Sequence, residues 1–139
     1  MATLTIEAGL VTKLTTTAGL TTLISTRTYL ERIPQGATLP CLTYQRISTP
    51  RVLTHDTSGS AGTAYPRFQF DAWATTYTSA KAISDALRTA LNGYRGTITS
   101  GADSVVVQAA LVDGETSLPD MEAGLARVTS EYVIWVQEA

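Results

Sequence analysis

The chain has 139 residues, of which 44% are hydrophobic and 16% are charged, and its formal net charge is −2. This length suits one domain that buries most of its unfolded surface without a metal or disulfide, so we expect no cofactor. The balance of 10 basic against 12 acidic residues argues against a domain that binds nucleic acids by neutralising phosphates.

The sequence also argues against a membrane or secreted protein. No apolar run approaches the roughly 20 residues of a membrane span. The first residues, MATLTIEAGLVTKL, lack a basic leader followed by an apolar core, which favours a cytoplasm. The single cysteine, Cys41, has apolar neighbours, and we interpret it as a small buried hydrophobe in preference to a reactive thiol.

Apolar residues at helical spacing predict an N-terminal helix over residues 3–18. They are Leu4, Ile6, Leu10, Val11 and Leu14. We expect Gly19 to end this helix, because glycine commonly closes the last turn. Leu20, Leu23 and Ile24 are then expected to form a short second turn on the same core.

Extended segments are predicted on both sides of a proline-containing connector. Residues 27–33 look extended, and residues 34–40, PQGATLP, form the connector because each proline removes a backbone donor. Residues 41–48, CLTYQRIS, are predicted to be a strand. Residues 49–64 are rich in Ser, Thr, Gly and Ala, which predicts a long mobile hairpin loop.

The most regular stretch runs from Tyr65 to Tyr94. Its first half alternates apolar and polar residues, which predicts a central strand with one buried face. From Tyr77 the apolar residues recur at three- and four-residue steps, which predicts an amphipathic helix. Thr76 or Thr78 can cap its first turn, and Gly93 suits the left-handed residue that closes its last turn. The expected buried residues are Phe68, Phe70, Ala72, Ala74, Ala80, Ile83, Leu87, Ala90 and Leu91.

Three further strands are expected. Residues 97–100 suit a short edge strand, and Val105–Val112, VVVQAALV, is apolar on both faces, which suits a strand covered on both sides. Asp113 and Gly114 form a turn pair that is predicted to open the next connector. The last strand is predicted over residues 126–137, with Val128, Tyr132, Ile134 and Val136 on one face and Arg127, Thr129, Glu131 and Trp135 on the other.

These elements predict one α+β domain over residues 1–139. Its sheet is expected to be mixed or mainly antiparallel, with about four or five strands. The N-terminal helix and the central amphipathic helix are expected to pack against it.

The chain shows no catalytic constellation. His55 and Asp56 are adjacent, whereas a general base and its orienting carboxylate usually come from separate segments. A single histidine excludes a zinc site built on several imidazoles, and no phosphate-binding glycine motif occurs. The carboxylates of Asp113, Glu115, Asp120 and Glu122 lack the spacing of a calcium loop, so we interpret them as a solvated loop. We therefore expect no enzyme.

Trp73 and Trp135 are the most unusual positions, because both fall on strand faces opposite the main apolar stripes. Such residues either pack under a covering loop or lie at a protein interface, where aromatic side chains are favoured. With the two-faced strand Val105–Val112, they are candidates for surface that a loop or another subunit covers. The candidate interface residues are Trp73, Trp135, Val106 and Gln108.

The order of segments resembles the tail-completion, or tail-terminator, family of long-tailed bacteriophages and their prophage relatives. The resemblance rests on the Arg-Thr-Tyr piece at residues 27–29, the run PQGATLPCLTYQRIS, a loop with a histidine, FQFDAWATTY followed by the helix AKAISDALRTALNGY, and the final SEYVIWVQE. It covers nearly the whole chain. Its most distinctive part is the pairing of LPCLTYQ with FQFDAWATTY.

The resemblance implies a small α+β fold and a structural function. Family members form a ring, commonly of six subunits, that caps the tail tube, ends its growth and presents a surface for joining to the head. The implied partners are other copies of the chain, the major tail tube protein and the head connector or stopper protein. The ring would assemble in the host cytoplasm and lie at the head-proximal end of the virion tail, where DNA passes without sequence-specific binding.

Residues 49–64 are the candidate segment for docking on the tail tube, with Arg51, His55 and Asp56 as its candidate residues. Two alternatives stay open. The chain could be another neck or adaptor protein of the same assembly, or a small-molecule-binding or hydrolytic α+β domain. Of these, the ring protein is the preferred interpretation.

Overall fold

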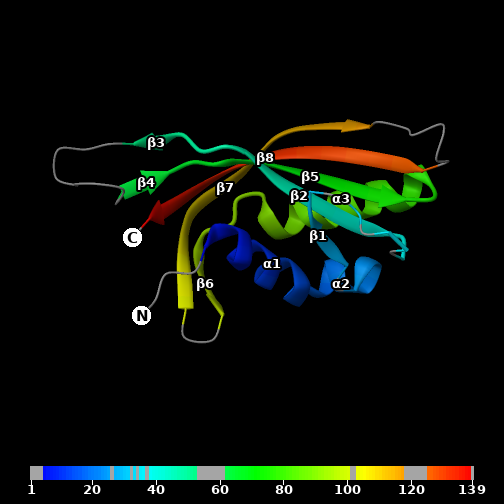
Figure 1. Ribbon diagram of the computed structural model, residues 1–139, viewed down its shortest axis with the longest axis horizontal. Helices are drawn as coiled ribbons and strands as arrows, with labels where there is room; N and C mark the ends of the chain where they lie inside the picture. Colours follow the sequence, from blue (N-terminus) through cyan, green and yellow to red (C-terminus); the bar gives the residue numbers. More distant parts are fainter. Residues whose placement is uncertain are drawn as a thin grey trace.

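The computed structural model describes residues 5–25, 27–31, 33, 35–36, 38–52, 62–100, 103–117 and 125–138 (Figure 1). The helices are α1 (Ile6–Thr16), α2 (Ala18–Ile24) and α3 (Tyr77–Leu91). Five strands have five or more residues: β2 (Cys41–Ser48), β5 (Arg67–Ala74), β6 (Gly96–Ser100), β7 (Asp103–Ser117) and β8 (Ala126–Glu138). Three are shorter: β1 (Thr28–Leu30), β3 (Arg51–Val52) and β4 (Gly62–Ala64). The predicted α+β class is confirmed.

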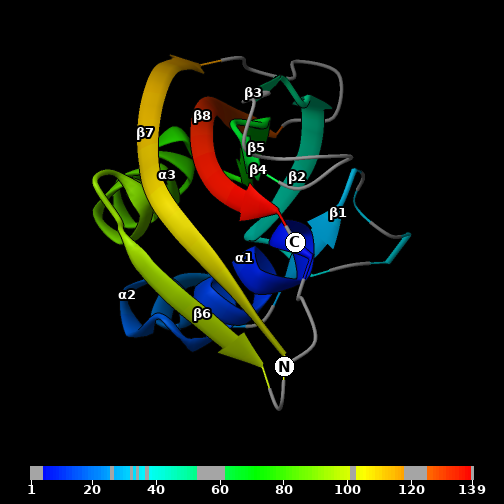
Figure 2. The ribbon, with the colours of Figure 1, turned by 90° about the vertical axis from the view of Figure 1, so that its left-hand side faces the viewer.

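All strands belong to one mixed sheet in which β8 is central. On one side β8 pairs with β5, which pairs in turn with β2 and then β1; on the other side it pairs with β7, which pairs with β6. Among the described strands, only the β1–β2 pair is parallel. The long strands β7 and β8 curve strongly, because each strand twists and the twist accumulates along it (Figure 2). The sheet therefore curls around the elements that cover its inner side.

Strands β2 and β3 pair with β5 and β4, respectively, so that they form one long hairpin. Residues 65–66 connect β4 to β5. Tyr65 N donates to Pro50 O (3.0 Å) and Ile134 N donates to Pro66 O (3.0 Å), so this connection is hydrogen-bonded on both sides. The β3–β4 end projects away from the helices (Figure 1). Part of the predicted loop 49–64 is thus paired strand, and residues 53–61 lie outside the described residues.

The first helix ends earlier than predicted. Gly19 does not end it: α1 stops at Thr16, Thr17 stands at the N-cap position of α2 without a side-chain capping bond, and Gly19 lies inside α2. The hydroxyls of Thr16 and Thr17 donate to the carbonyl oxygens of Thr12 (2.7 Å) and Lys13 (2.6 Å). Such bonds back to the preceding turn compete with the helix, which gives a physical reason for the break in this threonine run.

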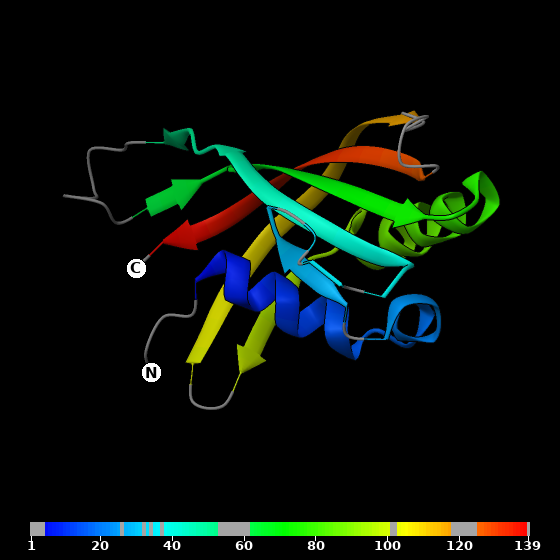
Figure 3. The same ribbon diagram turned by 45° about the vertical axis from the view of Figure 1, so that its right-hand side comes forward.

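The helices bury one face of the sheet, here called the inner face, and all three lie on this side (Figure 3). The predicted alternation of β5 and β8 is confirmed, and the largest fully buried side chains are Tyr132, Phe68, Phe70, Leu10, Leu14, Leu20, Ile24, Leu42, Ile83, Leu87, Leu91 and Ile134. Thr76 caps α3 by accepting from Ser79 N (3.2 Å), and Gly93 adopts φ +79° just beyond the helix, as predicted. On α3, Ser84 is buried and Ala90 only partly so.

The predicted turn at Asp113 and Gly114 is wrong, because β7 continues through both residues to Ser117. A bulge between Val112 and Gly114 absorbs one residue, and pairing with β8 resumes beyond it. Asp113 and Glu115, predicted in a solvated loop, belong to this strand and pair with Arg67 and Lys81. Long-range strand pairing has overridden the local turn signal.

Candidate assembly surface

The opposite face of the sheet, here called the outer face, carries no helix among the described residues. Side chains that alternate with the core residues of β2, β5, β8 and β7 point to it. Trp73 and Trp135 belong to this set, as the strand periodicity predicts, and so does Val106. Gln108 is exposed in a bulge of β7, where the alternation is interrupted. The outer face is therefore where the candidate residues must be assessed.

Trp73 lies in a polar cluster on the outer face. Its Nε1 donates to Thr43 Oγ1 (3.0 Å), and the guanidinium of Arg127 lies 5.0 Å from its ring centre. Arg127 Nη2 also donates to Asp71 Oδ2 (3.2 Å), a carboxylate that accepts from Gln69 as well. These contacts hold Trp73 in place, although Arg127 Nε is buried without a hydrogen-bond partner among the described residues.

Trp135 lies on the same face toward the C-terminal end of β8. Its ring stacks on Tyr65, with centroids 4.5 Å apart and planes inclined by 19°. On β7 the neighbouring outer residue Leu111 is 50% exposed and pairs with Val133. We call Tyr65, Leu111, Val133 and Trp135 the Trp135 patch. It is an ordered apolar surface of the kind that protein contacts favour.

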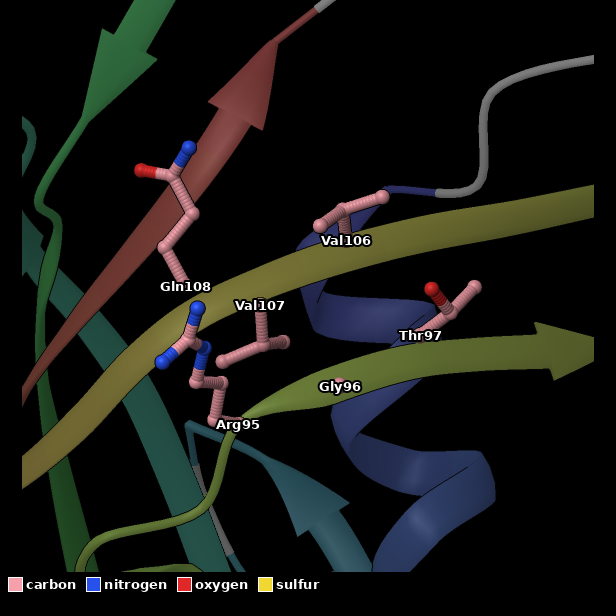
Figure 4. A pocket seen from close by; sticks show the side chains of 6 residues that line it. All are labelled: Arg95, Gly96, Thr97, Val106, Val107 and Gln108. Atoms are coloured by element: carbon pink, nitrogen blue, oxygen red, sulfur yellow. The ribbon is translucent and has the colours of Figure 1, made fainter.

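A shallow hollow of about 400 Å³ opens over β6 and β7 (Figure 4). Its lining residues are Arg95, Gly96, Thr97, Val106, Val107 and Gln108. Gln108 occupies a bulge between Val107 and Ala109, and Val106 pairs with Thr97 on the neighbouring strand. Val106 is 41% exposed, although it is apolar. Among the described side chains, that of Arg95 makes no ion pair or hydrogen bond.

Most other charged side chains of the described residues are matched. Arg67 pairs with Asp113 and lies 3.8 Å from Glu131, and Lys81 pairs with Glu115. Hydrogen bonds to these carboxylates raise the pKa of Arg67 and of Lys81. Arg46 on β2 pairs with Glu7 on α1, although the two residues are 39 positions apart in the sequence. Most charges of the described residues are therefore neutralised by a neighbour, in contrast to the charge of Arg95.

The described residues offer little for chemistry. No group of three His, Cys, Asp or Glu side chains among them could hold a metal ion. Cys41 is fully buried, as predicted, and burial raises the pKa of its thiol, which makes it a poor nucleophile. No helix within the described part is long and apolar enough to cross a membrane.

The family model described as "Tail completion protein gp17" matches residues 8–137. The chain belongs to this family. A chain in the structure "Virion of native gene transfer agent (GTA) particle" is similar in fold to this tail completion protein, with a TM-score of 0.66 and 16% identity. The match covers 91% of this chain and 90% of that one. A comparison with curated proteins gave no match.

Family membership gives this tail completion protein a structural role in a phage tail, as part of the virion. The resemblance that the segment order indicated is thereby confirmed. Its chemistry agrees with that role, since what the described residues present is ordered surface.

The structure brings together two of the four candidate interface residues. Val106 and Gln108 line the same hollow, whereas Trp73 and Trp135 lie at different parts of the outer face. Arg51 lies in β3, and His55 and Asp56 are outside the described residues. Tyr65, Leu111 and Arg95 were missed. The alternation of β7 could have indicated Leu111, but nothing local in the sequence shows that Arg95 lacks a partner.

Proposed function

We propose that this tail completion protein forms a ring at the head-proximal end of the tail tube, ends tube elongation and presents the surface to which the head joins. The observation that carries the proposal is the outer face, where the Trp135 patch and Val106 are ordered and apolar yet uncovered by the chain's own helices. A second copy of the chain is the proposed occupant. Identical subunits in a ring meet through two different patches of their surface.

Size and charge support a ring through which DNA passes. A chain of this length has a radius of gyration of about 14 Å, so six such bodies side by side leave an opening of roughly 35 Å. A duplex fits through that opening. The net charge of −2 also suits a channel in which DNA must slide, because a strongly basic lining would hold phosphates.

The proposed role is non-enzymatic, and its other partners are the major tail tube protein and the head connector or stopper protein. The projecting β3–β4 end of the hairpin is the proposed contact with the tail tube, and Arg51, His55 and Asp56 are its candidate residues. Deletion of residues 54–62 should then abolish attachment to tubes while the ring still forms. A deletion variant that attaches normally would remove this contact from the proposal.

An early stop codon in the gene, followed by negative-stain electron microscopy of the lysate, tests the proposed function. We expect filled heads without tails beside unattached tails of excessive or irregular length. Expression of the intact gene from a plasmid in the same cells should restore virions and serves as the control. Normal virions in the absence of the protein would overturn the proposal, and tails of normal length that fail to join would favour a neck or adaptor role.

A further inference from the structure

Two unpaired charges lie at opposite edges of the sheet. Among the described strands, β6 pairs only with β7 and β1 pairs only with β2, so each lies at an edge of the sheet. Arg95 immediately precedes β6, and Glu31 immediately follows β1. In Figure 2 the two strands lie on either side of α1. Edge strands leave backbone groups unpaired, so both edges are open to contact with another chain.

Glu31 is the counterpart of Arg95 in its lack of a partner. Of the acidic side chains that the structure describes, Glu7, Asp71, Asp85, Asp113, Glu115 and Glu131 each lie within ion-pair distance of a cation. Glu31 is exposed and makes no such contact with any described residue. Its backbone is held by the bond from its N to Tyr44 O (2.7 Å), in a left-handed conformation with φ +67°. The side chain is thus presented from a fixed position.

Each unpaired charge has an exposed apolar neighbour. Leu30, the last residue of β1, is 55% exposed beside Glu31. Val106 is 41% exposed in the hollow that Arg95 lines. One edge therefore presents an apolar side chain with an anion, and the other presents the apolar side chain of Val106 in a hollow that Arg95 also lines. An apolar contact with a polar rim is the usual anatomy of a protein interface.

We propose that the β1 edge of one subunit docks on the β6–β7 edge of the next subunit in the ring. Leu30 enters the hollow against Val106, and Glu31 pairs with Arg95. The two patches are different and lie on opposite edges of one sheet, so the contact is head to tail, as a closed ring requires. Charge complementarity fixes the pairing of the edges more than it sets the affinity. This contact rests on the proposed ring. Val106 belongs to the outer-face surface proposed above, and the β1 edge is the second patch, which meets it.

Charge reversal tests the contact in the full-length protein. Glu31→Arg or Arg95→Glu alone places like charges opposite each other and is expected to raise the protein concentration needed for half-assembly at least about tenfold. The matched double variant Glu31→Arg with Arg95→Glu should restore assembly to near the wild-type level. Native mass spectrometry over a concentration series, with electron microscopy of rings on tail tubes, measures both effects.

A mismatched pair controls for net charge. Glu31→Arg with Arg88→Glu has the same total charge as the matched double variant, but Arg88 is an exposed residue of α3 away from both edges. This variant should stay defective in assembly. Normal rings from both single variants, or equal rescue by the two doubles, would overturn the edge contact and leave the ring itself standing. Wild-type protein that forms no ring even on tail tubes would overturn the proposed function instead.

A cysteine pair tests the same contact without changing charge. Leu30→Cys and Val106→Cys in one chain should give, under oxidation, a ladder of covalent oligomers up to the ring size on a non-reducing gel. The native Cys41 does not interfere, because it is fully buried. Either single variant should stop at dimers or below. Wild-type rings combined with no ladder from the double variant would overturn the proposal.

Discussion

The two faces of the same strands differ in what completes them. On β8, the side chains of Val128, Ser130, Tyr132, Ile134 and Val136 are all buried beneath the chain's own helices. The intervening residues of β8 on the outer face are only partly buried. The same ordered strands are thus covered on the inner face and only partly covered on the outer face.

The polar groups of the two faces differ in the same way. The inner face holds the hydroxyl pair Ser84–Ser130 (3.1 Å), which is fully enclosed. The outer face holds charged groups, such as Arg127 on Asp71, beside exposed apolar side chains such as Leu111. Stability of the monomer should therefore depend on the inner face, and assembly should depend on the outer face and the sheet edges.

The largest effect on stability is expected from Phe70→Ala. Phe70 is 1% exposed and meets Tyr132 edge-on at 5.6 Å, so truncation leaves a cavity at the centre of the core. We expect the free energy of unfolding to fall by about 3–5 kcal/mol, measured by urea denaturation. Trp135→Ala on the outer face is the control and should cost about 1 kcal/mol. Equal losses from the two variants would contradict the division between the faces.

Trp135→Glu should separate assembly from folding. Trp135 is only partly buried in the monomer, so the carboxylate keeps contact with water and the chain folds, with a loss of about 1 kcal/mol at most. In the proposed ring the same charge would be desolvated, which should abolish assembly as seen by native mass spectrometry. Tyr77→Glu is the control, because Tyr77 is 53% exposed on α3, away from the outer face. Full assembly of the Trp135 variant would remove this patch from the interface.

The enclosed hydroxyl pair sharpens the comparison through a double-mutant cycle. Ser84→Ala or Ser130→Ala alone leaves a buried hydroxyl without its partner, which should cost about 1–2 kcal/mol in urea unfolding. In the double variant, the second substitution should lower the free energy of unfolding little beyond the first, because both polar groups are gone. Additive losses would show that the hydroxyls do not depend on each other.

The sequence predicted the inner face well because local periodicity records which side of a strand or helix is buried. The alternation from Arg67 to Ala74 and the helical stripe of α3 both appear in the structure with the expected buried residues. The misplaced boundaries, at Gly19 and at Asp113–Gly114, lie where side-chain bonds or strand pairing overruled a local signal.

The outer surfaces were less predictable from sequence. Parity along the strands placed Trp73 and Trp135 on the face opposite the main apolar stripes, but the hollow includes the bulge at Gln108, which has no local signature. The lack of partners for Arg95 and Glu31 is a property of the tertiary structure. A charge is recognised as unpaired only when every neighbour in space is known.

Tyr132→Phe is expected to have the smallest effect, and the only one on the inner face that stabilises. The Tyr132 hydroxyl is buried and finds no hydrogen-bond partner in the described part of the protein. Its removal therefore relieves an unsatisfied polar group, and we expect a gain of up to about 1 kcal/mol at pH 7, measured by urea denaturation. Ser84→Ala, which removes a paired hydroxyl from the same face, provides the contrast. A clear loss of stability in Tyr132→Phe would show that the hydroxyl is satisfied.

The same variant should change how stability depends on high pH. Burial raises the pKa of Tyr132, so the folded protein keeps its phenol proton at a pH where the unfolded chain, with a tyrosine pKa of about 10, releases it. The unfolded state then binds fewer protons, and the free energy of unfolding falls as pH rises above about 10, by up to about 1.4 kcal/mol per pH unit for this group. Tyr132→Phe should remove that part of the slope, while Tyr44, whose pKa burial also raises, retains its own. An unchanged slope would mean that Tyr132 ionises as readily in the folded core as in the unfolded chain.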